Sequence, residues 1–384
     1  MKEQFLKYSK TALLFLIVIF GFFPQTRIKG VMTLRPKLIQ LTIIVLCTIL
    51  LVSCQADTTI SNDINDVLVD EAYIEELIEK FSPLGDVPIP EDNELTEEAV
   101  ELGKKLFFDP RLSGNDELSC ASCHVPTLGW SDGKPLFEGF EGAQGPRRTP
   151  TIINAAYHKS LFWDGRADSL EEQALGPISS PIEMNMNLDK LADKLAKIDG
   201  YTELFYDVYG EDITIDNIAK ALASFQRTIV TTNTRFDQFL AGDYDALTEE
   251  EILGMDLFAN KARCIACHNG PHLTDNRFHN VGIESDDIGL KEFTGRNADD
   301  GAFRTPGLYG ITQHPPYMHD GSLETIEDVV EFYNRGGDDH INKSAMIKEL
   351  NLTEKEKKAL VAFLHTLEDR SLEEIEMPDL PDFE

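Results

Sequence analysis

The sequence contains the same five-residue pattern twice, as Cys120-Ala121-Ser122-Cys123-His124 and as Cys264-Ile265-Ala266-Cys267-His268. Similar residues precede the two patterns: Leu95-Thr96-Glu97-Glu98 before the first and Leu247-Thr248-Glu249-Glu250 before the second, each followed by a glycine and a Leu-Phe pair. In both copies the threonine can cap a helix whose first turn carries glutamates, where the helix dipole favours negative charge. The chain therefore contains one structural unit twice.

A second helix closes each unit. Ile218, Leu222 and Phe225 recur at helical spacing in the first unit, and Leu352-Thr353-Glu354 begins a helix that continues through Leu364 in the second. Strand signals are sparse, and the long segments 131–150 and 269–316 are rich in glycine, proline and polar residues. We therefore predict an all-α protein of two domains, residues 82–235 and 236–370, followed by an acidic tail over 371–384.

The repeated pattern is typical of covalent haem attachment. Two thiols one helical turn apart can add to both vinyl groups of one porphyrin, and the adjacent histidine can bind the iron. Zinc is the main alternative, but it takes four ligands, and each copy supplies only one thiol pair. A thioredoxin-like redox pair is expected in a βαβ context, which is missing. We predict two cytochrome c-like domains, each with one haem c, held by Cys120, Cys123 and His124 and by Cys264, Cys267 and His268.

Composition narrows the range of partners. Among 384 residues, 67 are Asp or Glu and 35 are Lys or Arg, which gives a formal net charge of -32. Phosphate backbones repel such a chain, so nucleic acid is excluded as a partner, and the surface favours a basic protein instead.

The N-terminal residues indicate export. Two apolar runs, residues 11–23 and 38–52, each follow basic residues, and the second ends in Leu51-Val52-Ser53-Cys54. This ending resembles the lipobox of bacterial lipoproteins. We expect residues 1–53 to be a signal leader, with 1–31 an over-extended start, and Cys54 to carry a membrane lipid on the periplasmic side. An uncleaved anchor is the alternative, and residues 54–81 are expected to form a polar tether.

From about residue 83 to 367 the sequence resembles the bacterial di-haem cytochrome c peroxidases and their relative MauG. The resemblance depends on residues 106–113 (LFFDPRLS), 162–166 (FWDGR), 181–184 (PIEM) and 316–321 (PYMHDG). It implies an all-helical, periplasmic protein. It further implies that hydrogen peroxide is reduced at an N-terminal haem, and that a C-terminal haem passes on electrons from a small cytochrome c or copper protein.

The resemblance also assigns residues. Glu183 matches the distal carboxylate of the peroxide haem and Gln173 the distal glutamine, and a carboxylate there can shuttle protons during peroxide cleavage. Trp163 matches a tryptophan that relays electrons between the haems. Without the resemblance, Glu183 is one surface acid among many, and Trp163 is a core aromatic at a domain boundary.

The sequence departs from the family pattern at three positions. Many members close the peroxide haem with a histidine from the loop after the first haem motif, but residues 125–149 contain none, which predicts an open haem. Tyr333 stands where the peroxidases use methionine and MauG uses tyrosine as the second ligand of the C-terminal iron. Met318 or Met346 is the alternative ligand. Arg148 replaces an asparagine that helps to hold calcium in the family, which argues against calcium in this chain.

The sequence therefore predicts a di-haem peroxidase that reduces hydrogen peroxide to water. One alternative is a MauG-like enzyme that oxidises residues of a protein substrate. The other is a di-haem electron carrier without enzymatic activity, in which both irons have two protein ligands.

Overall fold

A computed structural model describes residues 71–382 of the chain. The expected leader of residues 1–53, the lipid site at Cys54 and the tether as far as residue 70 lie outside the described residues. Within the described range, no helix is both long and apolar enough to cross a membrane.

The described chain is mostly helical, which agrees with the all-α prediction. Strands in this range are limited to β1 (Phe278–His279) and β2 (Phe303–Arg304), which pair antiparallel. The helices of the N-terminal domain are α5 (Glu97–Phe108), α6 (Cys120–Cys123), α7 (Leu170–Ser179), α8 (Leu188–Leu195), α9 (Asp199–Tyr209) and α10 (Ile215–Gln226). Those of the C-terminal domain are α4 (Glu71–Ile78), α11 (Arg235–Leu240), α12 (Glu249–Ala259), α13 (Lys291–Thr294), α14 (Ile326–Asn334) and α15 (Glu354–His365).

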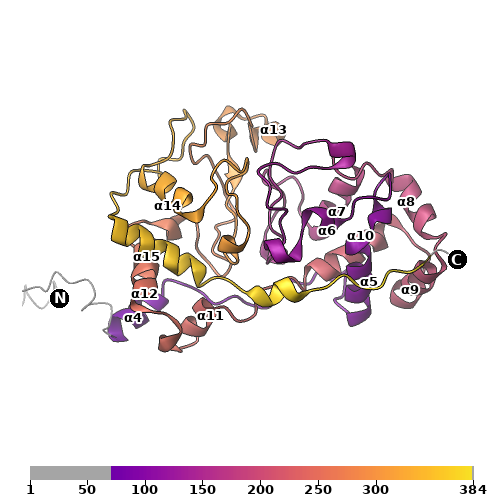
Figure 1. The fold of residues 1–384 in the computed structure, drawn as a ribbon, viewed down its shortest axis with the longest axis horizontal. Coiled ribbons are helices and arrows are strands. Elements are labelled where there is room, and N and C mark those ends of the chain that lie inside the picture. The colour runs from indigo at the N-terminus through magenta and orange to yellow at the C-terminus, as the bar shows by residue number, and fades with distance from the viewer. Residues whose placement is uncertain (1–70, 383–384) are drawn as a thin grey trace, which may run out of the picture. The chain divides into compact units, whose positions relative to one another are not determined.

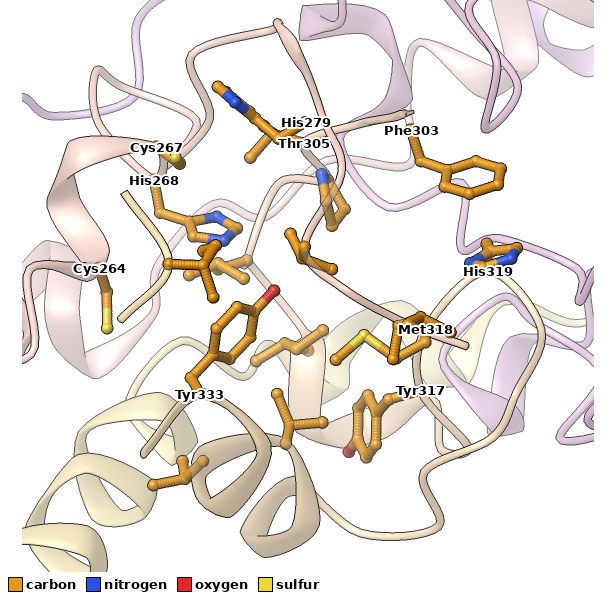
Figure 2. A pocket seen from close by; sticks show the side chains of 18 of the residues that line it. Cys264, Cys267, His268, His279, Phe303, Thr305, Tyr317, Met318, His319 and Tyr333 are labelled. Carbon is orange, nitrogen blue, oxygen red and sulfur yellow. The ribbon is translucent and has the colours of Figure 1, made fainter. Parts of the chain in front are cut away.

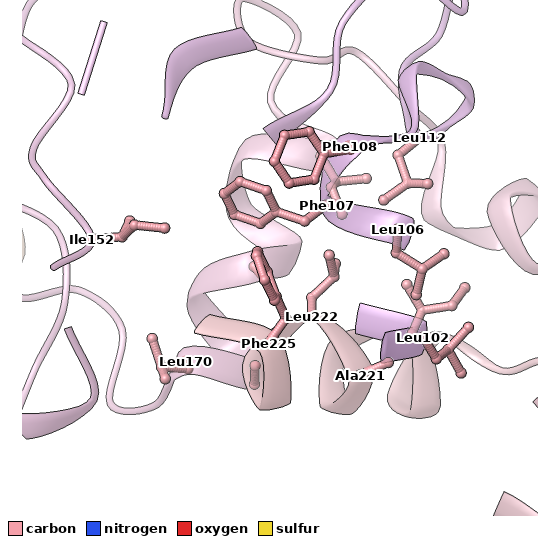
Figure 3. Close-up of a cluster of buried hydrophobic side chains, with 14 of the residues drawn as sticks. Leu102, Leu106, Phe107, Phe108, Leu112, Ile152, Leu170, Ala221, Leu222 and Phe225 are labelled. Carbon is pink, nitrogen blue, oxygen red and sulfur yellow. The ribbon is translucent and has the colours of Figure 1, made fainter. Parts of the chain in front are cut away.

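The N-terminal domain is built on the contact between α5 and α10 (Figure 1). The side chain of Thr96 caps α5 by accepting a hydrogen bond from the backbone of Ala99. The buried faces of the two helices meet in the cluster of Figure 3, where the rings of Phe107 and Phe225 lie edge to face, 5.2 Å apart. At Gly103 a side chain would have no room, because a Cβ atom there would lie 1.9 Å from the carbonyl oxygen of Ala221.

The C-terminal domain repeats this arrangement with α12 and α15. A threonine and a glutamate three residues later close a capping box at the start of each helix. Phe258 and Phe363 meet edge to face at 5.3 Å, and a Cβ atom on Gly254 would lie 1.9 Å from the carbonyl oxygen of Ala359. The repeat in the sequence is therefore a repeat of close helix packing.

Residues 71–81 differ from the expected tether. They form α4 and the turn after it, and Ile74, Leu77 and Phe81 are buried in the core of the C-terminal domain. The ring of Phe81 meets that of Phe236 edge to face at 5.4 Å. Three apolar residues at helical spacing bury more apolar surface against the domain than they would as part of a polar arm.

The C-terminal segment also differs from the expected free acidic tail over 371–384. Leu372 is 7% exposed and belongs to the core of the N-terminal domain, and its carbonyl oxygen accepts a hydrogen bond from the indole of Trp130 (3.1 Å). The segment therefore connects α15 with the other domain. Further contacts join Lys105 Nζ to Asp379 O (2.7 Å) and Arg111 Nη1 to Pro381 O (2.8 Å).

Arg147 joins the two domains through carboxylates. Its Nε and Nη2 atoms donate to both oxygens of Asp287 in the C-terminal domain, at 2.6 and 2.8 Å, and its Nη1 donates to the buried Asp164. Although burial alone would raise the pKa of Asp287, the hydrogen bonds from Arg147 lower it. A bidentate, largely buried pair of this kind fixes orientation as well as distance.

The glycine contact predicts the effect of a single methyl group. Gly254→Ala is expected to lower the free energy of unfolding by about 1–3 kcal/mol, because α12 and α15 must move apart to admit the new Cβ atom. Thermal or denaturant unfolding measures this change. Gly85→Ala is the control, since no heavy atom lies within 4 Å of a Cβ atom at that position. Equal stability of the two variants would contradict the close packing.

Candidate haem centres and the residues between them

The two motif histidines are held in the same way. His124 Nδ1 donates to the carbonyl oxygen of Trp130, and His268 Nδ1 donates to that of Leu273, both at 3.0 Å. Each bond fixes the tautomer and the ring orientation and leaves Nε2 available to a metal. Burial lowers the pKa of both imidazoles, so both are neutral at pH 7, as an iron ligand must be.

The four motif cysteines are free thiols in positions that suit thioether bonds. In each motif the backbone N–H of the histidine donates to the carbonyl oxygen of the first cysteine. The distance is 2.9 Å for Cys120 and 2.8 Å for Cys264, so the two motifs form the same turn. Burial raises the pKa of both thiols to about 12. Cys120 and Cys264 therefore remain protonated, and neither pair of cysteines has formed a disulfide that would compete with haem attachment.

A cavity of about 470 Å³ opens beside the second motif. This volume is typical of a cofactor pocket. Figure 2 shows Cys264, Cys267 and His268 along one side, and Tyr333 and Met318 projecting into the same space. Thiols, an imidazole and apolar walls together fit a haem. Among the apolar lining residues are Phe258, Leu308, Ile326, Val330 and Leu364.

All three side chains considered as second ligands of the C-terminal iron line this cavity. Tyr333 projects from α14 with its hydroxyl toward His268, and burial raises the pKa of its phenol. Met318 follows the buried Tyr317, whereas Met346 is 44% exposed at the edge. Tyr333 and Met318 both line the cavity, and in Figure 2 the phenol hydroxyl points toward His268.

Glu183 lies close to the first motif. It is half-buried just beyond the end of α7, and its carbonyl oxygen accepts a hydrogen bond from the backbone of Phe140 (2.8 Å). Burial raises the pKa of its carboxyl group. Its charge also contributes to the raised pKa of Cys123, about 11, after the larger effects of burial and of Asp132. A half-buried acid therefore lies within electrostatic reach of the predicted N-terminal haem.

Gln173 and Glu183 belong to one segment, formed by α7 and the turn that follows it. Gln173 is half-buried in the first half of α7, and among the described residues no hydrogen bond joins its side chain to Glu183. Its assignment as the distal glutamine stays a prediction.

Trp163 lies at the boundary between the two domains. Its indole Nε1 donates to the carbonyl oxygen of Arg148 (3.1 Å), and its own carbonyl oxygen accepts a bond from the backbone of Arg304 in β2 (2.8 Å). Its side chain also lines the cavity beside the second motif. This position agrees with an aromatic residue at the domain interface; its role as an electron relay stays a prediction.

Sequence reasoning missed several residues around the cavity. Arg304 lines it, and His314 does so with its Nε2 atom buried and without a partner. Each is a single residue in a long loop, so no spacing signal could have identified it. Tyr317 also lines the cavity; it lies in the motif of residues 316–321, which gave it no role of its own. His279 lies near Asp275 (2.8 Å) and Cys267, and these three could hold a metal ion only if Cys267 kept a free thiol.

The fold and both motifs define a protein of two cytochrome c-type domains with sites for covalent haem. Family models agree: residues 97–245 match that of the di-haem cytochrome c peroxidases and residues 252–368 match cytochrome c. The chain belongs to the di-haem cytochrome c peroxidase family, which includes MauG.

The named relatives include both MauG proteins and cytochrome c peroxidases. Methylamine utilization protein MauG of Methylorubrum extorquens is 43% identical over 300 residues, which cover 77% of this chain and 85% of the relative. Cytochrome c551 peroxidase of Nitrosomonas europaea is 39% identical over 276 residues, 70% of this chain and 79% of the relative. The crystal structure of a MauG-like protein associated with microbial copper homeostasis is 34% identical and covers 77% of this chain and 95% of its own, with a TM-score of 0.71.

Proposed function

We propose that this protein is a di-haem peroxidase, with one haem c in each domain, that reduces hydrogen peroxide to water. The observation that carries the proposal is the half-buried Glu183 near the first motif, combined with a loop over residues 125–149 that contains no histidine. Relatives named cytochrome c peroxidase support it.

No other histidine is available to close the N-terminal iron. His158 contacts Arg304 and Asn276, His319 stacks on Phe303, and His340 bonds to Asn280. His272, His279, His314 and His365 belong to the second domain and have neighbours there. These contacts of the described histidines support the proposal that the peroxide site needs no reductive opening.

The reduction of one hydrogen peroxide molecule to two water molecules consumes two electrons and two protons. Haem bound at His124 supplies the redox chemistry that breaks the O–O bond. Hydrogen peroxide has one oxygen atom nearer to the haem site and one farther from it. Glu183 takes the proton from the nearer oxygen and delivers it to the farther oxygen, which then leaves as water. Its pKa is raised by burial, so the carboxyl group gives up and regains a proton more readily near neutral pH than an exposed glutamate.

Electrons enter at the C-terminal domain and reach the N-terminal domain through Trp163. The indole and the backbone of Trp163 are both hydrogen-bonded, so the ring is held in one orientation between the two sites. The donor is a small cytochrome c or copper protein. Because the chain carries a formal charge of -32, a basic donor would meet it faster, and high salt would slow the encounter.

One observation favours a MauG-like enzyme as the second candidate. Tyr333 lies in the cavity, with its phenol directed toward His268, as an iron ligand would be. A phenolate stabilises higher oxidation states of iron, whereas a thioether raises the potential. Such an enzyme would draw electrons from residues of a protein substrate instead of a small donor.

The location of the protein is a separate proposal. We infer from residues 51–54 that the mature chain begins at Cys54, is lipidated there and faces the periplasm. Covalent haem attachment at both motifs agrees with an exported protein.

The peroxide reaction distinguishes the candidates. Stoichiometric hydrogen peroxide is expected to change the haem spectrum of the oxidised protein as isolated, and reduced cytochrome c is expected to support steady-state turnover. Peroxide-driven modification of a partner protein without such turnover would favour the MauG-like alternative. Two irons with two protein ligands each and no response to peroxide would contradict both enzymatic candidates.

Replacement of the proposed proton carrier tests the mechanism. Glu183→Gln is expected to lower kcat by about 100-fold or more, because the amide cannot carry the proton. The acidic limb of the kcat/KM profile should also disappear. In the wild type the rate falls as Glu183 is protonated, at a higher pH than for an exposed carboxylate because its pKa is raised. Glu138→Gln, at an exposed acid that pairs with Lys134, is the control and should retain wild-type rates.

The second iron ligand is tested by spectroscopy. Tyr333→Phe is expected to change the absorption spectrum of the C-terminal haem and to raise its midpoint potential, because the phenolate is lost. Met318→Leu is expected to leave the spectrum unchanged. Tyr206→Phe, at an exposed tyrosine on α9, controls for the loss of a hydroxyl group. The opposite result, with the spectrum sensitive to Met318 and not to Tyr333, would assign the methionine.

A further inference from the structure

Two buried arginines in the wall of the cavity have no carboxylate partner. Three arginines of the described range are buried, Arg148 (3% exposed), Arg227 (5%) and Arg304 (7%). Arg227 forms an ion pair with Glu171 at 2.8 Å, as a buried cation usually must. Within residues 71–382, neither Arg148 nor Arg304 has a carboxylate oxygen within 4.0 Å, although the chain is rich in acids. Both side chains line the cavity beside the second motif.

The partners of Arg148 are neutral and incomplete. Nη2 donates to Ser131 Oγ (3.0 Å) and to the carbonyl oxygen of His314 (2.7 Å). Nε is buried and has no hydrogen-bond partner, and neither does the neighbouring Nε2 atom of His314. Two residues that line the cavity, a guanidinium and an imidazole, therefore each contain a buried nitrogen atom without a partner, and such an atom costs free energy.

Arg304 also has only neutral hydrogen-bond partners. Its Nε donates to the carbonyl oxygen of Phe162 (3.3 Å), and its Nη1 contacts a ring nitrogen of His158 (2.6 Å). Burial lowers the pKa of Arg148 and of Arg304 to about 10, so both remain positively charged at neutral pH. Two positive charges without an ion-pair partner therefore line one largely apolar cavity, and only the longer-range charge of Asp132 acts on Arg148.

Arg147, the residue next to Arg148, differs from the two cavity arginines because it does have carboxylate partners. It bonds to Asp164 and Asp287 and so carries its counter-charge within the protein. The cavity-facing arginines lack this compensation. Haem c carries two propionate carboxylates, so the number and sign of the missing charges match the cofactor predicted for this cavity.

We propose that Arg148 and Arg304 hold the propionates of the haem attached at Cys264 and Cys267, and so turn that edge of the haem toward Trp163. This rests on the proposed haem in the C-terminal domain. Trp163 is bonded to both arginines, through its indole to the carbonyl oxygen of Arg148 and through its own carbonyl oxygen to the backbone of Arg304. The two positioning residues thus connect the cofactor edge with the interdomain tryptophan, and their charges stabilise the reduced haem.

The test measures the midpoint potential of each haem by spectroelectrochemistry in the full-length holoprotein. Arg148→Gln and Arg304→Gln are expected to lower the potential of the C-terminal haem, because the propionates lose their counter-charge. Arg148→Lys and Arg304→Lys keep the charge and should recover most of the potential. Arg227→Gln removes an equally buried arginine that lies away from the cavity, and it should leave that potential unchanged whatever it does to stability.

Three results would overturn the proposal: an unchanged C-terminal potential in both glutamine variants, a shift confined to the N-terminal haem, or an equal shift in Arg227→Gln. A shift confined to the N-terminal haem would assign the arginines to the propionates of that haem instead. If the glutamine variant at one position does not accumulate, the glutamine variant at the other position provides the comparison with the wild type. Haem content and peroxide turnover of the wild type are measured separately, so failure of the proposed peroxidase activity would leave this result interpretable.

Discussion

The hydrogen bond from each proximal imidazole to a backbone carbonyl a few residues downstream determines how a haem can be bound. It holds Nδ1 of His124 and of His268 and directs Nε2 to the space beside the two cysteines. The paired helices give this bond a rigid frame, because Gly103 and Gly254 let the backbones of α5 with α10 and of α12 with α15 approach to contact. Attachment and packing are thus the same in both domains.

What distinguishes the domains is what faces the attachment site. Beside the second motif, Tyr333 and Met318 enter the cavity and can complete the coordination of an iron. Near the first motif lies Glu183, a half-buried carboxyl group with a raised pKa, and the adjacent loop carries no histidine. One frame therefore supports a site suited to conduction and a site suited to proton-coupled chemistry.

The interface between the domains is polar and strongly directional. Arg147 binds Asp287 through two parallel hydrogen bonds, Trp163 is held by bonds to Arg148 and Arg304, and Leu372 carries the C-terminal segment into the core of the N-terminal domain. Such contacts specify orientation more than they add stability. An electron relay needs this property, because the distance between two redox centres must not vary.

The sequence alone determined the helical class, the repeat, the attachment residues and the family, because covalent haem attachment requires fixed spacing within five residues and helices have a fixed period. It also marked Glu183, Trp163 and Tyr333 through longer motifs. It did not reveal that residues 71–81 and Leu372 pack into the two cores, since one to three apolar residues are too few to stand out in an acidic segment. Nor could it place Arg148 and Arg304 beside one cavity without carboxylate partners. These features depend on contacts between loops far apart in the chain, and only the tertiary structure decides which charges meet and which remain unpaired.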